Sequence, residues 1–183
     1  MKRLSFFNYL LLLACVTIIF VVIYVTVQQT YRTGADDPQI QITSDIKSRL
    51  HDGKNINQYL NDTINISESL SPFVTLYDAK EKPLRSSGYL NEKPPQLPGG
   101  VFDFAKNYGE DRVTWQPQPG VRMAMVIVYT NTFPVSFIAA GRSLQEVEIR
   151  ESKLVTIVFI GWVICVALVL LYAVLQFHQN RNA

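Results

Sequence analysis

The chain has few of the residues on which metal, redox and nucleophilic chemistry depend. Its 183 residues include two histidines and two cysteines. His51 and His178 are separated by a long apolar run, so they cannot share a site. Cys15 and Cys165 lie inside apolar runs, where a cysteine is usually a small buried filler. These absences exclude most zinc sites and most catalytic triads, and they leave the central segment without a disulfide.

Other catalytic signatures are also missing. Gly99-Gly100 has neither the lysine nor the further glycines of a phosphate-binding loop. The stretch 141–143, GRS, lacks the second glycine of a nucleophile elbow. A glycosidase-like carboxylate pair stays open, although no aromatic-rich cleft pattern accompanies the acidic residues. We therefore expect no enzyme, no cofactor and no metal.

What the chain does have is two long uncharged apolar runs, at residues 6–27 and 154–177. Each is long enough to cross a bilayer core of about 30 Å. The first continues into QQTYR without a cleavage site, which favours an uncleaved anchor over the alternative, a signal peptide. Lys2 and Arg3 precede it, and the positive-inside rule therefore predicts a cytoplasmic amino terminus.

Two spans place both termini on the cytoplasmic side of the cell (inner) membrane. The expected organisation is a cytoplasmic end (1–5), a first span (6–27), a periplasmic or extracellular domain (28–153), a second span (154–177) and a cytoplasmic tail (178–183). The central segment carries 14 basic and 15 acidic residues, a net charge of −1. This balance gives no basic surface for nucleic acid.

The central segment reads as an α+β domain. Asp37 as a cap and Pro38 at the first helical position predict a helix that ends near Gly53. Residues 55–71 predict an irregular connection, and residues 72–88 a β-hairpin with its turn at 79–83. A proline- and glycine-rich loop at 92–100 precedes a short helix over 101–109. Three antiparallel strands are then expected, at 112–116, 121–130 and 135–140. The strand at 121–130 is apolar on both faces and should be interior.

The second apolar run is predicted to be the end of one long helix. Ser143 and Glu146 have the spacing of a capping box, in which the serine oxygen accepts the amide hydrogen of the third helical residue. Glu146 and Arg150 are spaced to form an ion pair one turn apart. No glycine or proline lies between Leu144 and Lys153, so we expect a continuous signal-transmitting helix over 143–177. The alternative is a short connector joined flexibly to a separate membrane helix.

The order of these parts resembles the extracytoplasmic PAS-like sensor domains, of the single Cache or PDC type, of bacterial two-component histidine kinases. The stretches that carry the resemblance are DPQIQ (37–41), SLSPFVTLYD (69–78), SSGYL (86–90), VTWQPQPGVRMA (113–124) and AGRSLQEVEIRE (140–151). The resemblance implies a PAS-like antiparallel sheet with covering helices, flanked by two transmembrane helices. It also implies a ligand held between the sheet and its covering loops by aromatic walls and one or two cations.

The candidate ligand-binding residues lie on or beside the predicted strands: Tyr77, Arg85, Trp115, Arg122 and Tyr129. Arginine suits a small carboxylate or amino-acid ligand because its forked donors bind both carboxylate oxygens. Each residue has a structural alternative. Tyr77 and Trp115 could be core aromatics, Arg85 a solvated hairpin residue, and Arg122 a strand-end charge paired with an acidic residue.

After Phe177 only HQNRNA follows, so we expect no HAMP, kinase or other output region. A sensor of this kind would pass its signal to a separate signalling protein such as a histidine kinase, or to a second copy. Gly161 and Cys165 form a small-xxx-small pair that would let two helices approach closely. The competing hypothesis is an envelope docking or structural protein without a ligand. Arg122 ion-paired within the fold favours docking, whereas a cavity into which Arg122 or Arg85 points favours sensing.

Overall fold

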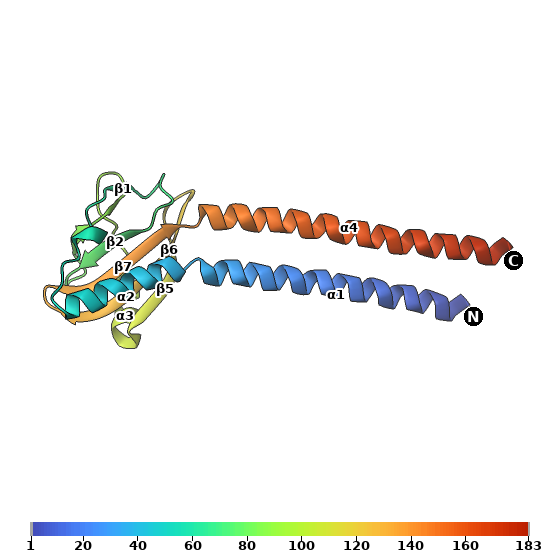
Figure 1. Cartoon of the computed structure of the whole chain (residues 1–183), viewed down its shortest axis with the longest axis horizontal. Coiled ribbons are helices and arrows are strands. Elements are labelled where there is room, and N and C mark those ends of the chain that lie inside the picture. Colours follow the sequence, from blue (N-terminus) through green and yellow to red (C-terminus); the bar gives the residue numbers. More distant parts are fainter. Residues whose placement is uncertain (1, 183) are drawn as a thin grey trace. The chain divides into compact units, whose positions relative to one another are not determined.

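The computed structural model describes the backbone of residues 2–182 and the side chains of residues 7–179. The chain divides into two compact units. One comprises Met1–Tyr31 with Ile149–Ala183, and the other comprises Arg32–Glu148. The first contains most of two helices, α1 (Lys2–Gly34) and α4 (Gln145–Asn182). The second is built around a β-sheet and includes the last residues of α1 and the first turn of α4 (Figure 1). We refer to them as the helical unit and the sheet unit.

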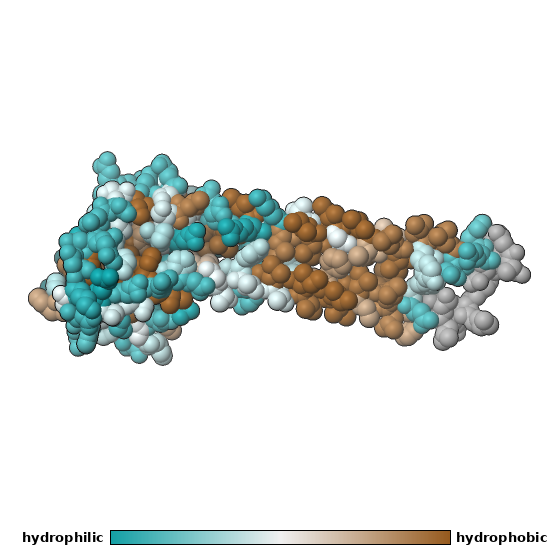
Figure 2. Space-filling model, in the orientation of Figure 1, coloured by the Kyte–Doolittle hydropathy of each residue, from teal (hydrophilic) through white to brown (hydrophobic). Residues whose placement is uncertain are grey.

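Both helices are long and apolar enough to cross a membrane. Figure 2 shows hydrophobic surface along the middle of each helix, with hydrophilic residues towards their ends. α1 ends at Gly34, where the absence of a side chain favours a stop. α4 runs without interruption from Gln145 to Asn182, which confirms a single helix over most of the predicted length.

The sheet unit contains five antiparallel strands in the order β3-β2-β7-β6-β5. Their bounds are β2 Phe73–Tyr77, β3 Pro83–Ser86, β5 Glu110–Gln118, β6 Val121–Thr132 and β7 Val135–Ser143. A two-stranded parallel sheet joins β1 (Ile64–Asn65) to β4 (Gly88–Tyr89). The predicted hairpin and three later strands are confirmed, and β6 lies between β7 and β5, as its apolar pattern predicts. The fold is therefore a mixed helix and sheet arrangement.

A hydrophobic core lies on each face of the sheet. Helix α2 (Asp37–His51) covers one face, where Ile46 packs with Leu76 and Ile138. Helix α3 (Gly99–Tyr108) covers the other, where Phe102 packs with the larger core cluster, including Phe137. We call these the α2 face and the α3 face. Residues 55–71 contain the short 3-10 helix η1 (Asn57–Tyr59) and β1, in agreement with the expected irregular connection.

The start of α2 differs from the prediction. The cap residue is Asp36, one position before the expected Asp37, and its side chain makes no capping hydrogen bond. Pro38 nevertheless lies in the first turn, where a missing amide hydrogen removes no helix hydrogen bond. The buried side of α2 also includes two polar residues, Gln39 and Thr43, that an apolar pattern does not reveal. The Thr43 hydroxyl donates to backbone carbonyls of its own helix.

Two glycines make room for the ring of Phe73. A Cβ atom built on Gly88 would lie 2.5 Å from the Phe73 ring, and one built on Gly141 would collide with both Phe73 and the Met125 sulfur. Phe73 itself is 1% exposed. One aromatic side chain therefore fills the space over a glycine of the small sheet and a glycine of β7.

We expect Gly141→Ala to lower the free energy of unfolding by about 1–3 kcal/mol, because the core must shift to admit the methyl group. Urea denaturation followed by Trp115 fluorescence, in a Trp162→Phe background, measures this change. Gly100→Ala is the control, since a Cβ there meets nothing within 4 Å. Equal stabilities for the two variants would contradict the packing account.

Candidate functional site

Three of the five candidate ligand-binding residues lie on the α3 face, with Tyr77 and Tyr129 beside Phe137 and Trp115 towards the opposite end of β6. The strand register pairs Tyr77 and Tyr129 with Phe137, and Trp115 with Met123. The Tyr77 ring centroid is 4.9 Å from that of Phe102, and the Tyr129 centroid is 5.5 Å from that of Phe137. Trp115 and Tyr129 are partly buried against the same core cluster. These aromatic side chains pack as core residues.

The Tyr77 hydroxyl is engaged within the fold. The side chain is 0% exposed, and its hydroxyl donates a hydrogen bond of 2.7 Å to the Pro95 carbonyl. Burial raises the pKa of Tyr77 far above its usual value, because the phenolate would lose its hydration. Tyr77 is therefore a neutral residue that joins β2 to the loop before α3.

The two arginines lie on the other side of the sheet from these aromatics. Arg85 pairs in register with Leu76, which belongs to the core on the α2 face, and its guanidinium donates to Asn57 Oδ1 at 2.8 Å. Arg122 lies between Val121 and Met123, both of which belong to the core on the α3 face. Side chains alternate along a strand, so Arg122 projects to the opposite face. The structure does not bring the five candidates into one site.

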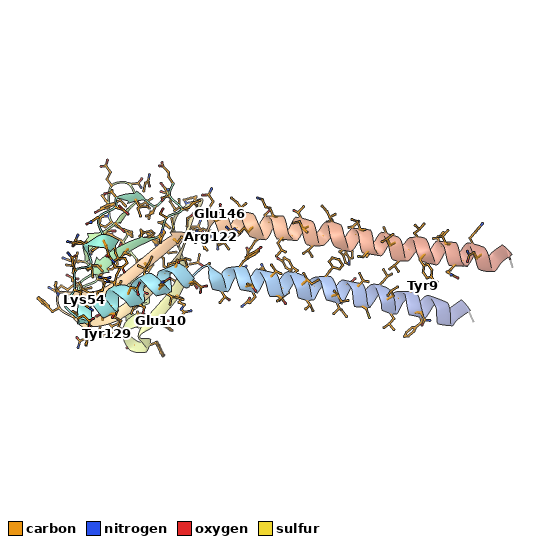
Figure 3. The ribbon with its side chains drawn as sticks, in the orientation of Figure 1. Tyr9, Lys54, Glu110, Arg122, Tyr129 and Glu146 are labelled. Atoms are coloured by element: carbon orange, nitrogen blue, oxygen red, sulfur yellow. The ribbon has the colours of Figure 1, made fainter. Side chains whose placement is uncertain are left out.

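Arg122 and Tyr129 also lie at opposite ends of β6 (Figure 3). Seven residues of extended strand separate them, which is about 23 Å. Arg122 is at the end of the strand near the start of α4, whereas Tyr129 is at the end near the β6–β7 connection. One small ligand cannot contact both.

Arg122 instead connects the sheet to α4. The Leu144 amide donates to the Arg122 carbonyl at 2.9 Å, and the Arg122 guanidinium forms an ion pair with Glu148 in the first turn of α4. Their side chains are 48% and 43% exposed, so the ion pair itself contributes at most about 1 kcal/mol. The backbone bond and the ion pair together fix the first turn of α4 against β6.

The residues predicted to begin a signal-transmitting helix lie close to their expected positions. Ser143 is the last residue of β7, and its Oγ accepts the Gln145 amide hydrogen at 3.3 Å, whereas the capping box predicts the amide of Glu146 as donor. Glu146 lies in the first turn of α4 (Figure 3). Arg150 is exposed on the following turn. The ion pair between Glu146 and Arg150 stays a prediction.

A second contact joins the same part of β6 to the start of α2. The Gln39 side-chain amide donates to the Ala35 carbonyl at 3.0 Å and to the Ala124 carbonyl at 3.2 Å. Gln39 is fully buried, and its Oε1 atom has no hydrogen-bond partner among the residues that the structure describes. Ala35 directly follows α1. We call Arg122–Ala124, with its contacts to Gln39, Leu144 and Glu148, the β6 junction.

Sequence reasoning missed two residues of the β6 junction. Gln39 was not predicted to be buried, because the apolar residues Ile40 and Ile46 define the buried side of α2 in the sequence. Glu148 was not singled out because the capping-box pattern drew attention to Glu146. An acidic partner for Arg122 was one of the alternatives expected from the sequence, but the sequence did not identify which residue it would be. Among the described residues, no three His, Cys, Asp or Glu side chains are placed to hold a metal ion.

The buried Tyr77 hydroxyl predicts a dependence of stability on alkaline pH. Its pKa is raised on folding, so its contribution is present below the unfolded pKa of about 10 and is lost as the pH rises further. We expect Tyr77→Phe to cost about 1 kcal/mol at pH 7. We also expect the stability difference from the parent chain to shrink above pH 10. Urea denaturation at pH 7 to 11.5 tests this.

Tyr108→Phe is the matched control, because Tyr108 is 73% exposed. Its stability should follow that of the parent chain at every pH. A parent chain and a Tyr77→Phe variant that stay separated by a constant difference above pH 10 would show that Tyr77 titrates alike in both states.

Comparison with known proteins adds no family to this description. No model of a known protein family matches the chain, and no curated protein matches it at a significant level. The resemblance to PAS-like sensor domains therefore rests on the order of the elements and on the sequence stretches that carry it.

Proposed function

We propose that the chain is a two-span membrane protein whose sheet unit is a PAS-like sensor module outside the cytoplasmic membrane. The element order supports the resemblance, since a helix, a hairpin, a second helix and three antiparallel strands follow one another between α1 and α4. The strand order is consistent with the resemblance as well. β2 and β7, which come first and last along the chain among the five strands, are neighbours in the sheet. Lys2 and Arg3 support cytoplasmic termini.

The β6 junction is the observation that carries this proposal. β6 is buried on both faces, and one short stretch of it contacts the start of α2 through Gln39 and the start of α4 through Leu144 and Glu148. A change in β6 or β7 must therefore alter the first turn of α4, which continues as an apolar helix. A partner that binds two arrangements of this junction with different affinities would shift the equilibrium between them.

We place the input on the surface of the sheet unit, with a protein partner as its source. The aromatic candidates are packed with the core on the α3 face, and both arginines already bind groups of the chain itself. Neither arginine is left in the arrangement expected for a small carboxylate site. Output passes through α4 to a separate signalling protein, such as a histidine kinase.

The second candidate is a docking or structural protein of the envelope, in which the sheet unit binds a partner and transmits nothing. The Arg122–Glu148 ion pair favours it, because this is the arrangement that the docking hypothesis predicted for Arg122. The two candidates differ in one measurable respect. A sensor changes α4 when its outer domain is bound, and a docking protein does not.

A surrogate partner can separate these two candidates in lipid nanodiscs. The full chain carries spin labels introduced by Phe7→Cys and Phe177→Cys, with both native cysteines replaced by alanine. The binder is an antibody fragment raised against the β6–β7 connection, where Phe133 is 99% exposed. We expect binding to change the distance distribution between the labels, because the first turn of α4 moves with β6.

Two variants of equal length test whether α4 carries the change. Ser152→Gly with Lys153→Pro breaks the helix beyond the β6 junction, since proline removes a helix hydrogen bond and clashes with the preceding turn. Ser152→Ala with Lys153→Ala keeps it. We expect the label response to be lost in the first and kept in the second. An unchanged distance in the bound parent chain would favour the docking protein.

A further inference from the structure

The two helices of the helical unit contact each other along one side. The half-buried positions of α1 recur every three or four residues and include Leu13, Thr17, Phe20 and Tyr24. Those of α4 have the same spacing and include Gly161, Cys165, Val169 and Ala173. Side chains at this spacing share one face of a helix. The large side chains come mainly from α1 and the small ones from α4.

Phe20 of α1 occupies the space over Gly161 of α4. A Cβ atom built on Gly161 would lie 3.0 Å from the Phe20 ring. Farther along the pair, Tyr9 and Tyr172 form an edge-to-face contact with centroids 6.0 Å apart. The small-xxx-small pair Gly161 and Cys165, whose spacing lets two helices approach closely, therefore faces a helix of its own chain.

One polar contact lies in the middle of this apolar pair. The Trp162 indole N–H donates to Thr17 Oγ1 at 3.1 Å, and the Thr17 hydroxyl donates to the Leu13 carbonyl at 2.9 Å. The Thr17 hydroxyl thus accepts a hydrogen bond from Trp162 of α4 and donates one to a backbone carbonyl of its own helix, α1. Trp162 and Thr17 are both at least seven residues inside their apolar runs, where lipid offers no acceptor for an indole N–H.

This contact distinguishes one helix register from its neighbours. The α1 positions on the same side, one turn before and after Thr17, are Leu13 and Phe20. Neither side chain has an acceptor. Sliding α4 by one turn in either direction would leave the Trp162 N–H in apolar surroundings without a hydrogen bond, which is costly. The packing of Phe20 over Gly161 favours the same register.

We propose that Thr17 and Trp162 are positioning residues that fix the register of a preformed, intramolecular membrane hairpin. The small-residue side of α4 is filled by α1, so a signalling partner in the membrane meets the outward sides of the two helices. The consequence for signalling rests on the proposed sensor function: α4 pivots about the Thr17–Trp162 contact and does not slide along α1 as a piston.

Disulfide trapping tests the register in the full chain in lipid nanodiscs, with no binder present. Val16 is one turn before Phe20, and Cys165 is one turn after Gly161, so the antiparallel helices bring positions 16 and 165 together. Cys15→Ala with Val16→Cys leaves one cysteine on each helix. We expect mild oxidation to give an internal disulfide in the monomer.

Thr17→Val, added to this chain, should slow the internal disulfide about threefold, because the polar contact between the helices is lost while the side-chain shape is kept. Thr17→Ser should retain the parental rate, since it keeps the acceptor. Thr156→Val should also retain it, because that hydroxyl donates within its own helix to Ser152. A purely structural methyl requirement would instead favour valine over serine.

Two results would overturn the proposal. The first is a disulfide-linked dimer through Cys165, which would show that a second copy fills the small-residue side of α4. The second is equal trapping in the Thr17→Val and Thr17→Ser chains. Trapping needs no input, so either result leaves the sensor proposal standing. An unresponsive α4 in the label experiment, in turn, leaves the register contact intact.

Discussion

The burial of β6 on both faces is the constraint on which the rest of the sheet unit depends. Its odd-numbered residues from Val121 to Ile127 belong to the α3 face, and Ala124 and Val126 are buried on the other side, which α2 covers. Both cores therefore need the same strand, and neither can change without affecting it. The β6 junction places the starts of α2 and α4 on this strand, so a displacement of the strand reaches both helices.

Much of the fold could be predicted because periodicity reports burial directly. An apolar pattern on both faces identified β6, and Gly109, with a φ of +92°, ended α3 as its lack of a side chain allows. What periodicity could not supply was the choice among similar side chains. Asp36 and Asp37 are both good caps, and Glu146 and Glu148 are both acidic residues in one helical turn. Tertiary contacts made those choices.

The candidate site was predictable only in part, and one error was avoidable. Arg122 and Tyr129 are an odd number of residues apart on one regular strand, so alternation alone places them on opposite faces. The sequence pattern contained this information. Gln39 is a different case, because a buried glutamine is recognised only when its donor reaches a specific carbonyl, here that of Ala124.

The position of β7 has a consequence for biogenesis. The last strand of the sheet unit is not at an edge but between β2 and β6, and the residues of β2 that pair with it lie 60 to 68 positions earlier in the chain. Contacts of such long range form late and slowly. If the sheet unit lies on the outer side of the membrane, the sheet cannot be completed until Ser143, the last residue of β7, has been translocated. Folding of the outer domain and membrane insertion of α4 would then be consecutive steps of one process.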